Sequence, residues 1–190
     1  GRNAHTSFVS ASILVDFDIK WIYPKNDKSY LSCEIDPSEL DKMLSNVAEL
    51  PFAVFVTSPD YLGNMIDIKE ISNVCKKHGV ILIVDNAHGA YLKFGDISKH
   101  PIDLGADMCC DSAHKTLNVL TGGAYLHISK NAPVYFSEQA KNVMCIYGST
   151  SPSYLILESL DRCNEYLENG YKNKLDFAIN KADEVKKSLR

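Results

Sequence analysis

The chain lacks a hydrophobic run long enough to cross a membrane. Its longest uninterrupted apolar stretch is VILIV at residues 80–84, far short of the roughly 20 residues that a spanning helix needs. It also lacks a basic excess, since 20 Lys and Arg face 24 Asp and Glu, for a net charge of −4. This balance argues against nucleic acid or an anionic membrane as the main partner. With 190 residues, of which 45% are hydrophobic, the chain can form one sizeable globular domain.

Cysteine motifs are absent as well. The chain has six cysteines, but none form a C-x-x-C pair, and their spacing does not resemble a disulfide framework. Cys109 and Cys110 lie inside an apolar run, where free cysteine behaves as a small hydrophobic residue. We therefore expect all six to be reduced and the protein to be cytoplasmic.

Short apolar runs alternate with helix-like segments along the chain. The runs are continuous instead of alternating with polar residues, which is typical of strands buried on both faces of a mostly parallel sheet. The pattern predicts an α/β fold, with a mostly parallel sheet sandwiched by helices. Predicted strands cover residues 18–24, 52–56, 80–85, 106–112 and 123–129, and predicted helices cover 36–50, 67–79 and 151–169.

Local signals mark the ends of two predicted helices. Asp36 is placed to cap the first, and Pro37 suits its first turn. Asp67 and Glu70 form an Asp-x-x-Glu cap at the second, which Gly79 can end. A further helix is predicted near the end of the chain by an apolar stripe of Leu175, Ala178, Ile179, Ala182, Val185 and Leu189.

An acid and a lysine follow two of the predicted strands. Asp85 ends the run VILIVD, and Lys115 comes shortly after the run ADMCCDS. Alone, Asp85 is interpreted equally well as a cap of the next turn, and Lys115 alone would most often be a surface lysine. In open α/β sheets, however, ligands bind at the carboxyl ends of the strands. With imidazoles and a hydroxyl in the same two loops, these residues have the parts needed for pyridoxal 5′-phosphate chemistry.

Five segments, in order, resemble the ornithine/lysine/arginine decarboxylase family over residues 1 to about 165. The most specific are VDNAHGAYLKF, similar to the family's Val-Asp-Glu-Ala-His-Gly-Ala-His segment, and DSAHKTLNVLTGGAYLH, similar to its Ser-x-His-Lys-Thr-Leu cofactor-attachment site. The others are GRNAHTS, VTSPDYLG and STSPSYLILESLD. The resemblance implies the large domain of a fold type I pyridoxal-phosphate enzyme.

The resemblance also implies a role for each matching residue. Lys115 would form the Schiff base with the cofactor aldehyde, and Asp85 would pair with the pyridine nitrogen. The other implied site residues are His5 stacked on the cofactor ring, Ala87 on its opposite face, His88 near the cofactor or substrate, and Ser112 and His114 at the phosphate. The remaining histidines, His78, His100 and His127, match nothing in the family, so we expect no metal site.

The resemblance further implies a domain plan and an assembly. Residues 1–170 would form the core of the cofactor-binding domain, and the amphipathic helix of residues 171–190 would lead towards a small C-terminal domain. The family's phosphate-binding loop would lie upstream, so we expect a piece of a longer polypeptide. Asn86 stands where the family has glutamate, and Gly122 and Gly123 lie near the expected contact of a homodimer or higher homo-oligomer.

The expected activity is decarboxylation of lysine, arginine or ornithine to an amine and carbon dioxide, as in polyamine metabolism. One alternative is another reaction on the same scaffold, such as transamination or a lyase step, because fold and cofactor do not select the reaction. The second is a catalytically incomplete domain that serves as a binding or structural module. The substrate in the first two cases is a small amino acid.

Overall fold

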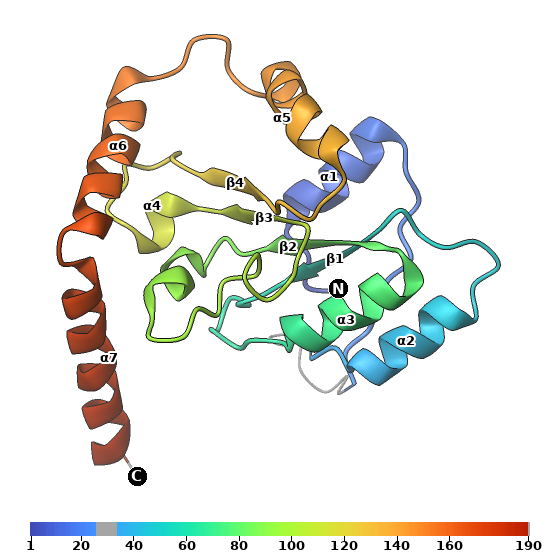
Figure 1. Ribbon diagram of the computed structural model, residues 1–190, viewed down its shortest axis with the longest axis horizontal. Coiled ribbons are helices and arrows are strands. Elements are labelled where there is room, and N and C mark those ends of the chain that lie inside the picture. The colour runs from blue at the N-terminus through green and yellow to red at the C-terminus, as the bar shows by residue number, and fades with distance from the viewer. Residues whose placement is uncertain (26–33, 190) are drawn as a thin grey trace.

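The computed structural model describes residues 1–25 and 34–189, and its centre is a four-stranded sheet (Figure 1). The strand order is β1-β2-β3-β4, in which β1, β2 and β3 are parallel and β4 runs antiparallel to β3. The predicted mostly parallel sheet is therefore confirmed. The strands are β1 (Ala53–Thr57), β2 (Ile81–Asp85), β3 (Met108–Asp111) and β4 (Tyr125–Ile128).

Helices connect the strands and extend the chain beyond the sheet. The last of them, α7, projects away from the body of the molecule (Figure 1). The helices are α1 (Thr6–Val15), α2 (Pro37–Ser45), α3 (Ile68–His78), the short 3-10 helix η1 (Ala90–Phe94), α4 (Ala113–Thr116), α5 (Val134–Tyr147), α6 (Tyr154–Glu168) and α7 (Tyr171–Ser188).

One face of the sheet forms the main hydrophobic core with α2 and α3. In β1, Val54 and Val56 are buried while their neighbours are only partly buried, as expected where successive side chains point to opposite faces. The same core contains residues from α2, α3 and the two next strands: Leu40, Leu44, Ile68, Ile71, Cys75, Leu82, Val84 and Cys109. These residues were largely within the apolar runs and stripes of the sequence.

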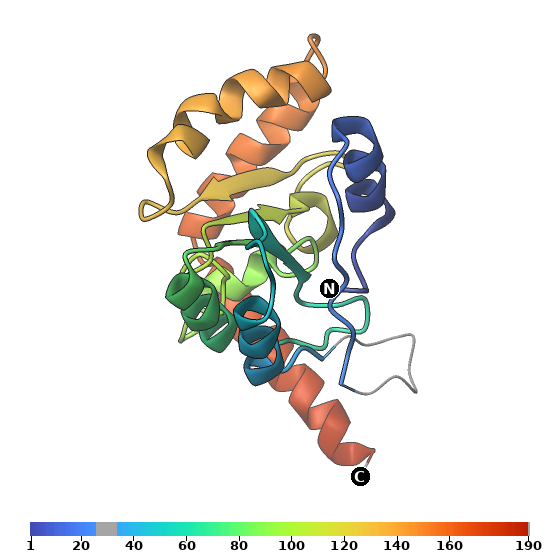
Figure 2. The ribbon, with the colours of Figure 1, turned by 90° about the vertical axis from the view of Figure 1, so that its right-hand side faces the viewer.

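Helix α1 covers the opposite face. The ring of Phe8 in α1 stacks on Phe55 of β1, with centroids 4.2 Å apart, and the amino group of Gly1 donates to the Phe55 carbonyl oxygen at 2.6 Å. Figure 2 shows α1 on the other side of the sheet from α2 and α3. The sheet is thus sandwiched by helices, as predicted.

The predicted helix caps are present. The Asp36 side chain accepts a hydrogen bond from the Ser38 amide at 2.8 Å, and Asp67 accepts one from the Glu70 amide at 3.0 Å. Gly79 ends α3 with a φ of 69°, a left-handed conformation that glycine adopts at little cost. Helix α2 ends at Ser45, five residues earlier than its apolar pattern suggested.

The strand predicted at residues 18–24 is wrong. This segment has no strand or helix assignment, and its contact with the chain start is a hydrogen bond from the Arg2 amide to the Ile22 carbonyl oxygen, at 3.0 Å. Asp16, in a left-handed conformation with φ 56°, reverses the chain just before it. The segment therefore packs as an extended connection, with the buried Ile22 as its anchor.

The helix predicted near the end of the chain is confirmed as α7, but its apolar stripe is largely solvent-exposed. Val185 and Leu189 are 57% and 82% exposed. The domain boundary near residue 170 stays a prediction. Among the described residues, no helix is long and apolar enough to span a membrane.

Five of the six cysteines lie in the described ranges, and all five are free. Cys33 lies outside those ranges. An apolar cavity of about 720 Å³ lies between α1, α2 and β1, and its lining includes none of the predicted site residues. The predicted site residues therefore lie outside this cavity.

Gly89 gives a direct test of packing beside β2. A Cβ atom there would lie 2.1 Å from Oδ1 of Asn86 and 2.7 Å from Cδ of Pro59, although the backbone φ of −123° suits any residue. We expect Gly89→Ala to lower the free energy of unfolding by roughly 1–3 kcal/mol through overpacking. Chemical denaturation measures this change.

The matched control for Gly89→Ala is Gly95→Ala. At Gly95 a Cβ atom would have a backbone oxygen of Ile97 at 3.6 Å as its neighbour, an ordinary contact. Gly95→Ala should leave the unfolding midpoint nearly unchanged. Equal stability of the two variants would contradict the packing described beside Asn86.

Candidate active site

The carboxyl ends of the three parallel strands meet at one edge of the sheet. Thr57 at the end of β1 lies in register with Asp85 at the end of β2, and Asp85 lies in register with Cys110 of β3. Ligands of open α/β sheets bind outside this edge. The predicted site residues from the two loops after β2 and β3 therefore start from neighbouring strand ends.

Asp85 is buried, with 8% of its surface exposed. Its Oδ1 atom accepts a hydrogen bond from the Ala87 amide at 3.1 Å, so the side chain does cap the turn after β2. The Cys110 thiol lies 3.9 Å from the same oxygen. A buried carboxylate held in this way is rigid and can stabilise a positive charge placed next to it.

Cys110 supports this carboxylate as a protonated thiol. Burial among protein atoms, and then the charge of Asp85, raise the pKa of Cys110 to about 11, although part of the residue reaches solvent. At neutral pH the thiol therefore keeps its proton and can donate weakly to Asp85. It is not a candidate nucleophile, because the thiolate is the reactive form.

Lys115 lies in α4, directly after the end of β3, and is exposed. Its Nζ atom is 3.4 Å from Nε2 of His88. Among the described residues, no carboxylate lies within salt-bridge distance of this amine, so it is open to react with a ligand. The structure thus brings two predicted site residues, from different loops, into direct contact.

His88 is held in an environment that disfavours its charge. Burial, and then the nearby ammonium of Lys115, lower the pKa of His88, while Asp85 and Asp60 oppose the shift more weakly. Its ring also contacts the edge of the Tyr61 ring, with centroids 5.3 Å apart. At neutral pH the His88 imidazole is therefore expected to be uncharged beside Lys115.

This environment gives a measurable pH behaviour. The NMR signal that disappears in His88→Gln should titrate with a midpoint below 6.5, the ordinary value for histidine. Lys115→Met should move the midpoint part of the way back up, because it removes the charge of Lys115 and leaves the larger effect of burial. A midpoint at or above 6.5 in the parent protein would contradict the contact described here.

Ser112 and His114 lie on either side of the turn that begins α4. The Nδ1–H of His114 donates to the Gly123 carbonyl oxygen at 3.0 Å, which fixes the ring and leaves Nε2 for another partner. The hydroxyl of Ser112, at the N-cap of α4, makes no capping hydrogen bond to this short helix. Both side chains therefore keep polar atoms that a ligand could use.

His5 is the N-cap of α1, where its Nδ1 accepts a hydrogen bond from the Ser7 amide at 3.2 Å. It is exposed. The structure brings it near enough for its charge to contribute to the lowered pKa of His88, after the larger effects of burial and Lys115. No direct contact joins His5 to Asp85 or Lys115 among the interactions of the described residues.

Two buried hydroxyl oxygens near this edge have no hydrogen-bond partner among the described residues, Oγ1 of Thr57 and Oγ1 of Thr116. Thr57 is the register partner of Asp85, and Thr116 follows Lys115. Buried polar atoms without partners are uncommon in proteins. An aromatic cofactor with a ring nitrogen, an aldehyde and polar substituents fits this donor set, with Asp85 for the nitrogen and Lys115 for the aldehyde.

Two residues of the edge, Tyr61 and Asn86, had no assigned role in the sequence. Tyr61 lies in the motif VTSPDYLG, but only the structure places its ring against His88. Asn86 is fully buried and donates from Nδ2 to Oδ1 of Asp111 at 2.6 Å. A glutamate at position 86 would put a second carboxylate against Asp111, so the departure from the family pattern fits the acid at position 111.

Gly123 is buried against its own chain. A Cβ atom there would lie 2.2 Å from Cγ1 of Val119 and 3.4 Å from Cδ2 of Leu160. A large side chain at Gly123 would therefore disturb the fold of one subunit directly. The interpretation of this glycine as part of a turn before β4 accounts for its position without a neighbouring subunit.

Comparisons with known proteins agree with this architecture. Mouse CSAD superposes with a TM-score of 0.66 at 18% identity, over 98% of this chain and 42% of that one. Serine palmitoyltransferase of Sphingomonas wittichii gives a TM-score of 0.63 at 18% identity, over 88% of this chain and 40% of that one. These likenesses show the fold of fold type I pyridoxal-phosphate enzymes, as predicted.

Sequence relatives cover most of the chain. The uncharacterized protein YaaO of Bacillus subtilis is 29% identical over 88% of this chain and 35% of its own length. An arginine decarboxylase of Halalkalibacterium halodurans is 26% identical over 99% of this chain and 38% of its own length. The chain thus spans well under half the length of these relatives.

The family model described as "Orn/Lys/Arg decarboxylase, major domain" matches residues 1–190. The match includes both loops that contain Asp85 and Lys115, and the expected resemblance is confirmed. The chain belongs to the Orn/Lys/Arg decarboxylase family and corresponds to its major domain.

Proposed function

We propose that the polypeptide containing this chain is a pyridoxal-phosphate-dependent decarboxylase of lysine, arginine or ornithine. The observation that carries the proposal is the position of Asp85 and Lys115 at adjacent strand ends. An amine that contacts His88 but no described carboxylate, and a buried carboxylate, lie there at the edge where such folds bind ligands. Curated relatives named arginine decarboxylase support a basic amino acid as the substrate.

In this proposal each residue has a defined task. Lys115 would hold the cofactor through Nζ, and Asp85 would stabilise a positive charge on its ring nitrogen. Ser112 and His114 would bind its phosphate, and His5 and Ala87 would contact its ring. When bound, pyridoxal phosphate supplies the electron sink for the carbon–carbon bond that breaks.

His88 is proposed to handle a proton at Lys115. Its Nε2 lies 3.4 Å from Nζ of Lys115, and its lowered pKa keeps it uncharged at neutral pH. An uncharged imidazole can accept a proton from the ammonium and release the neutral amine that reacts with an aldehyde. The residues around the substrate then orient the bond between its α-carbon and its carboxylate. This orientation decides which bond breaks.

The alternatives retain some support. Solved structures with this fold include a serine palmitoyltransferase and a cystathione gamma lyase, so the fold alone does not select decarboxylation over transamination or a lyase step. A non-catalytic module is the second alternative, which the intact Lys115 and Asp85 argue against. The family match favours decarboxylation over both.

Assembly into a homodimer or larger oligomer is part of the proposal. Ile13 and Leu14 of α1 are 76% and 75% exposed, and Ile146 of α5 is 74% exposed. Large apolar side chains exposed together often mark contact surfaces. We also propose that α7 leads to a separate small domain. The free cysteines fit a protein of the reducing cytoplasm. The proposed reaction would give the protein a role in polyamine metabolism.

Product analysis tests the proposed reaction. The full polypeptide, supplied with pyridoxal phosphate, is incubated separately with lysine, ornithine and arginine labelled in the carboxyl group. We expect one of the three to release labelled carbon dioxide and an equal amount of the corresponding amine. A keto acid without carbon dioxide would establish the aminotransferase alternative, and no turnover together with no cofactor binding would establish the non-catalytic module.

A further inference from the structure

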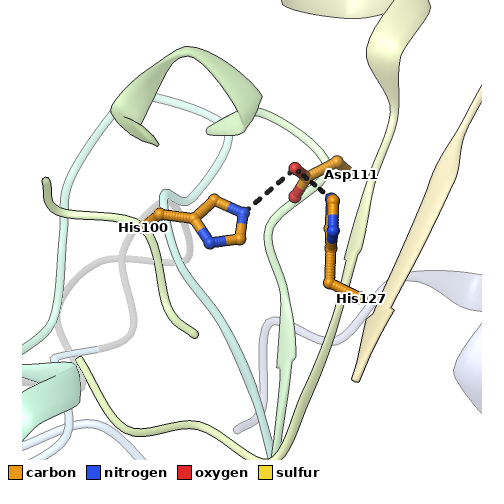
Figure 3. Close-up of side chains that lie close together, drawn as sticks. All are labelled: His100, Asp111 and His127. Atoms are coloured by element: carbon orange, nitrogen blue, oxygen red, sulfur yellow. Dashed lines mark hydrogen bonds and ion pairs between the residues drawn. The ribbon is translucent and has the colours of Figure 1, made fainter. Parts of the chain in front are cut away.

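Two histidines and an aspartate converge beside β3 (Figure 3). The Oδ2 atom of Asp111 is 3.1 Å from Nε2 of His100 and 3.1 Å from Nε2 of His127. All three donor atoms lie within 4.8 Å of one another. They come from three places in the chain, since His100 precedes β3, Asp111 ends it and His127 lies in β4.

The cluster faces the opposite side of the sheet from Asp85. Neighbouring residues of a strand point to opposite faces, and in β3 Cys110 contacts Asp85. Asp111 therefore points to the other face, as does Cys109, the register partner of His127. The three side chains are thus separate from the residues assigned to cofactor binding.

The chemistry and spacing of the donors suit a transition metal. Two imidazole nitrogens and one carboxylate oxygen are ligands that Zn²⁺ accepts at about 2.0–2.2 Å, which places tetrahedral ligands about 3.3 Å apart. The two observed separations of 3.1 Å are close to this value. His100 and Asp111 are 4% and 3% exposed, so these two donors are held by packing before any ion binds, while His127 is partly exposed.

Neighbouring groups complete the arrangement. The buried Asn86 amide donates to Oδ1 of Asp111 at 2.6 Å, which leaves Oδ2 directed at the two imidazoles. Such outer contacts orient metal-binding carboxylates. A cavity of about 390 Å³ is lined by His100, Asp111 and His127, so water can reach a fourth coordination position. The Sγ atom of Cys109 lies 3.7 Å from Nε2 of His100, outside the converging set.

We propose that His100, Asp111 and His127 bind one divalent transition metal ion, with Zn²⁺ as the best match, through the two Nε2 atoms and Oδ2. The ion joins β3, β4 and the segment before β3 at a single point. This point is one residue from Ser112 and four from Lys115 in the chain. The site is therefore structural, and it fixes the base of the turn that presents Lys115.

Metal binding to the full polypeptide, stripped with a chelator and free of cofactor, tests the proposal. Calorimetric titration with ZnCl₂ should give one tight site per chain that depends on these residues, and zinc should raise the melting temperature. Co²⁺ at the same site should give the intense visible bands of a four-coordinate ion. None of these readouts depends on enzymatic activity or on pyridoxal phosphate.

Matched variants locate the ion. His127→Ala, at a partly exposed position, should weaken zinc binding roughly 100-fold or more, and Asn86→Ala should weaken it roughly 10- to 100-fold. The control is His78→Ala, because Nε2 of His78 also contacts a carboxylate, Oδ1 of Asp41 at 2.6 Å, but without a second histidine. His78→Ala and Lys115→Ala should both bind zinc as the parent does.

Circular dichroism establishes that each variant is folded. If the stripped parent takes up no zinc at equimolar concentration, the proposal is overturned, and the cluster is a hydrogen-bonded His–Asp–His network. Equal zinc affinity of the parent and folded His127→Ala would overturn it as well. Zinc binding is measured without pyridoxal phosphate, and cofactor retention is measured without added zinc, so failure of the metal site and failure of the cofactor proposal are distinguishable.

Discussion

Replacement of Lys115 by alanine should abolish covalent retention of pyridoxal phosphate and lower turnover by roughly three orders of magnitude or more. The reason is geometric. Lys115 is the lysine at the sheet edge whose Nζ contacts His88, at 3.4 Å, and its side chain is not engaged by a described carboxylate. The visible absorption band of the bound cofactor, before and after gel filtration, measures retention.

Lys99→Ala is the matched control. Lys99 is also exposed, and it follows η1 in the connection between β2 and β3, beyond the turn that contains His88, so its loss should change neither the absorption band nor turnover. Lys115→Ala should keep the parent's far-ultraviolet spectrum, because an exposed side chain contributes little to the core. A Lys115→Ala variant that retained the band and near-parental turnover would contradict the assignment of this residue.

Asp85→Asn should keep the cofactor but lower turnover on the order of 100-fold, the typical effect of removing one preorganised electrostatic contact. The neutral amide cannot stabilise a protonated pyridine nitrogen, so the electron sink is weakened. The oxygen of the introduced amide can still accept the hydrogen bond from the Ala87 amide. In the parent this bond is 3.1 Å long, from the Ala87 nitrogen to Oδ1 of Asp85. The strand-end turn should therefore survive, and the loss should appear in kcat.

The comparison that decides this prediction is with Asp161→Asn, an exposed carboxylate on α6. Asp161→Asn should have parental kinetics. If Asp85→Asn also had near-parental kinetics, Asp85 would serve only to cap the turn after β2. If Asp85→Asn instead failed to fold, spectra and unfolding midpoints would show it, and Asp85→Glu would then test the charge with the carboxylate retained.

Much of the fold could be predicted because local signals and packing agree. The runs at β1 to β4 are apolar where the sheet is buried, and Asp67 and Gly79 mark the ends of α3 by their own hydrogen bonds and backbone. The strand prediction at residues 18–24 was wrong because the segment has apolar residues but no strand partner. Its Ile22 is buried by tertiary packing, which periodicity alone does not reveal.

Helices α1 and α5 had no clear signature in the sequence. Helix α1 is apolar on most sides, and exposed residues such as Ile13 and Leu14 give it no polar face. Helix α5 has no side-chain cap and no buried residue. Amphipathic patterning identifies a helix by one apolar stripe beside a polar face, so helices without this contrast are missed.

The candidate site residues also differ in how well the sequence predicts their positions. Asp85 and Lys115 could be located because they follow buried strands, and strand ends are where α/β sheets bind ligands. The cluster of His100, Asp111 and His127 could not, since its members are 11 and 16 residues apart and belong to no motif. Only the pairing of β3 with β4 brings His127 beside Asp111.

Borohydride reduction of the parent protein with pyridoxal phosphate, followed by peptide mapping, tests the central claim most directly. Reduction makes the bond between lysine and cofactor permanent, so the labelled peptide identifies the attachment residue. We predict one pyridoxyl group per chain, on Lys115 in the segment DSAHKTL. A label on any other lysine, or no stable label at all, would contradict the account.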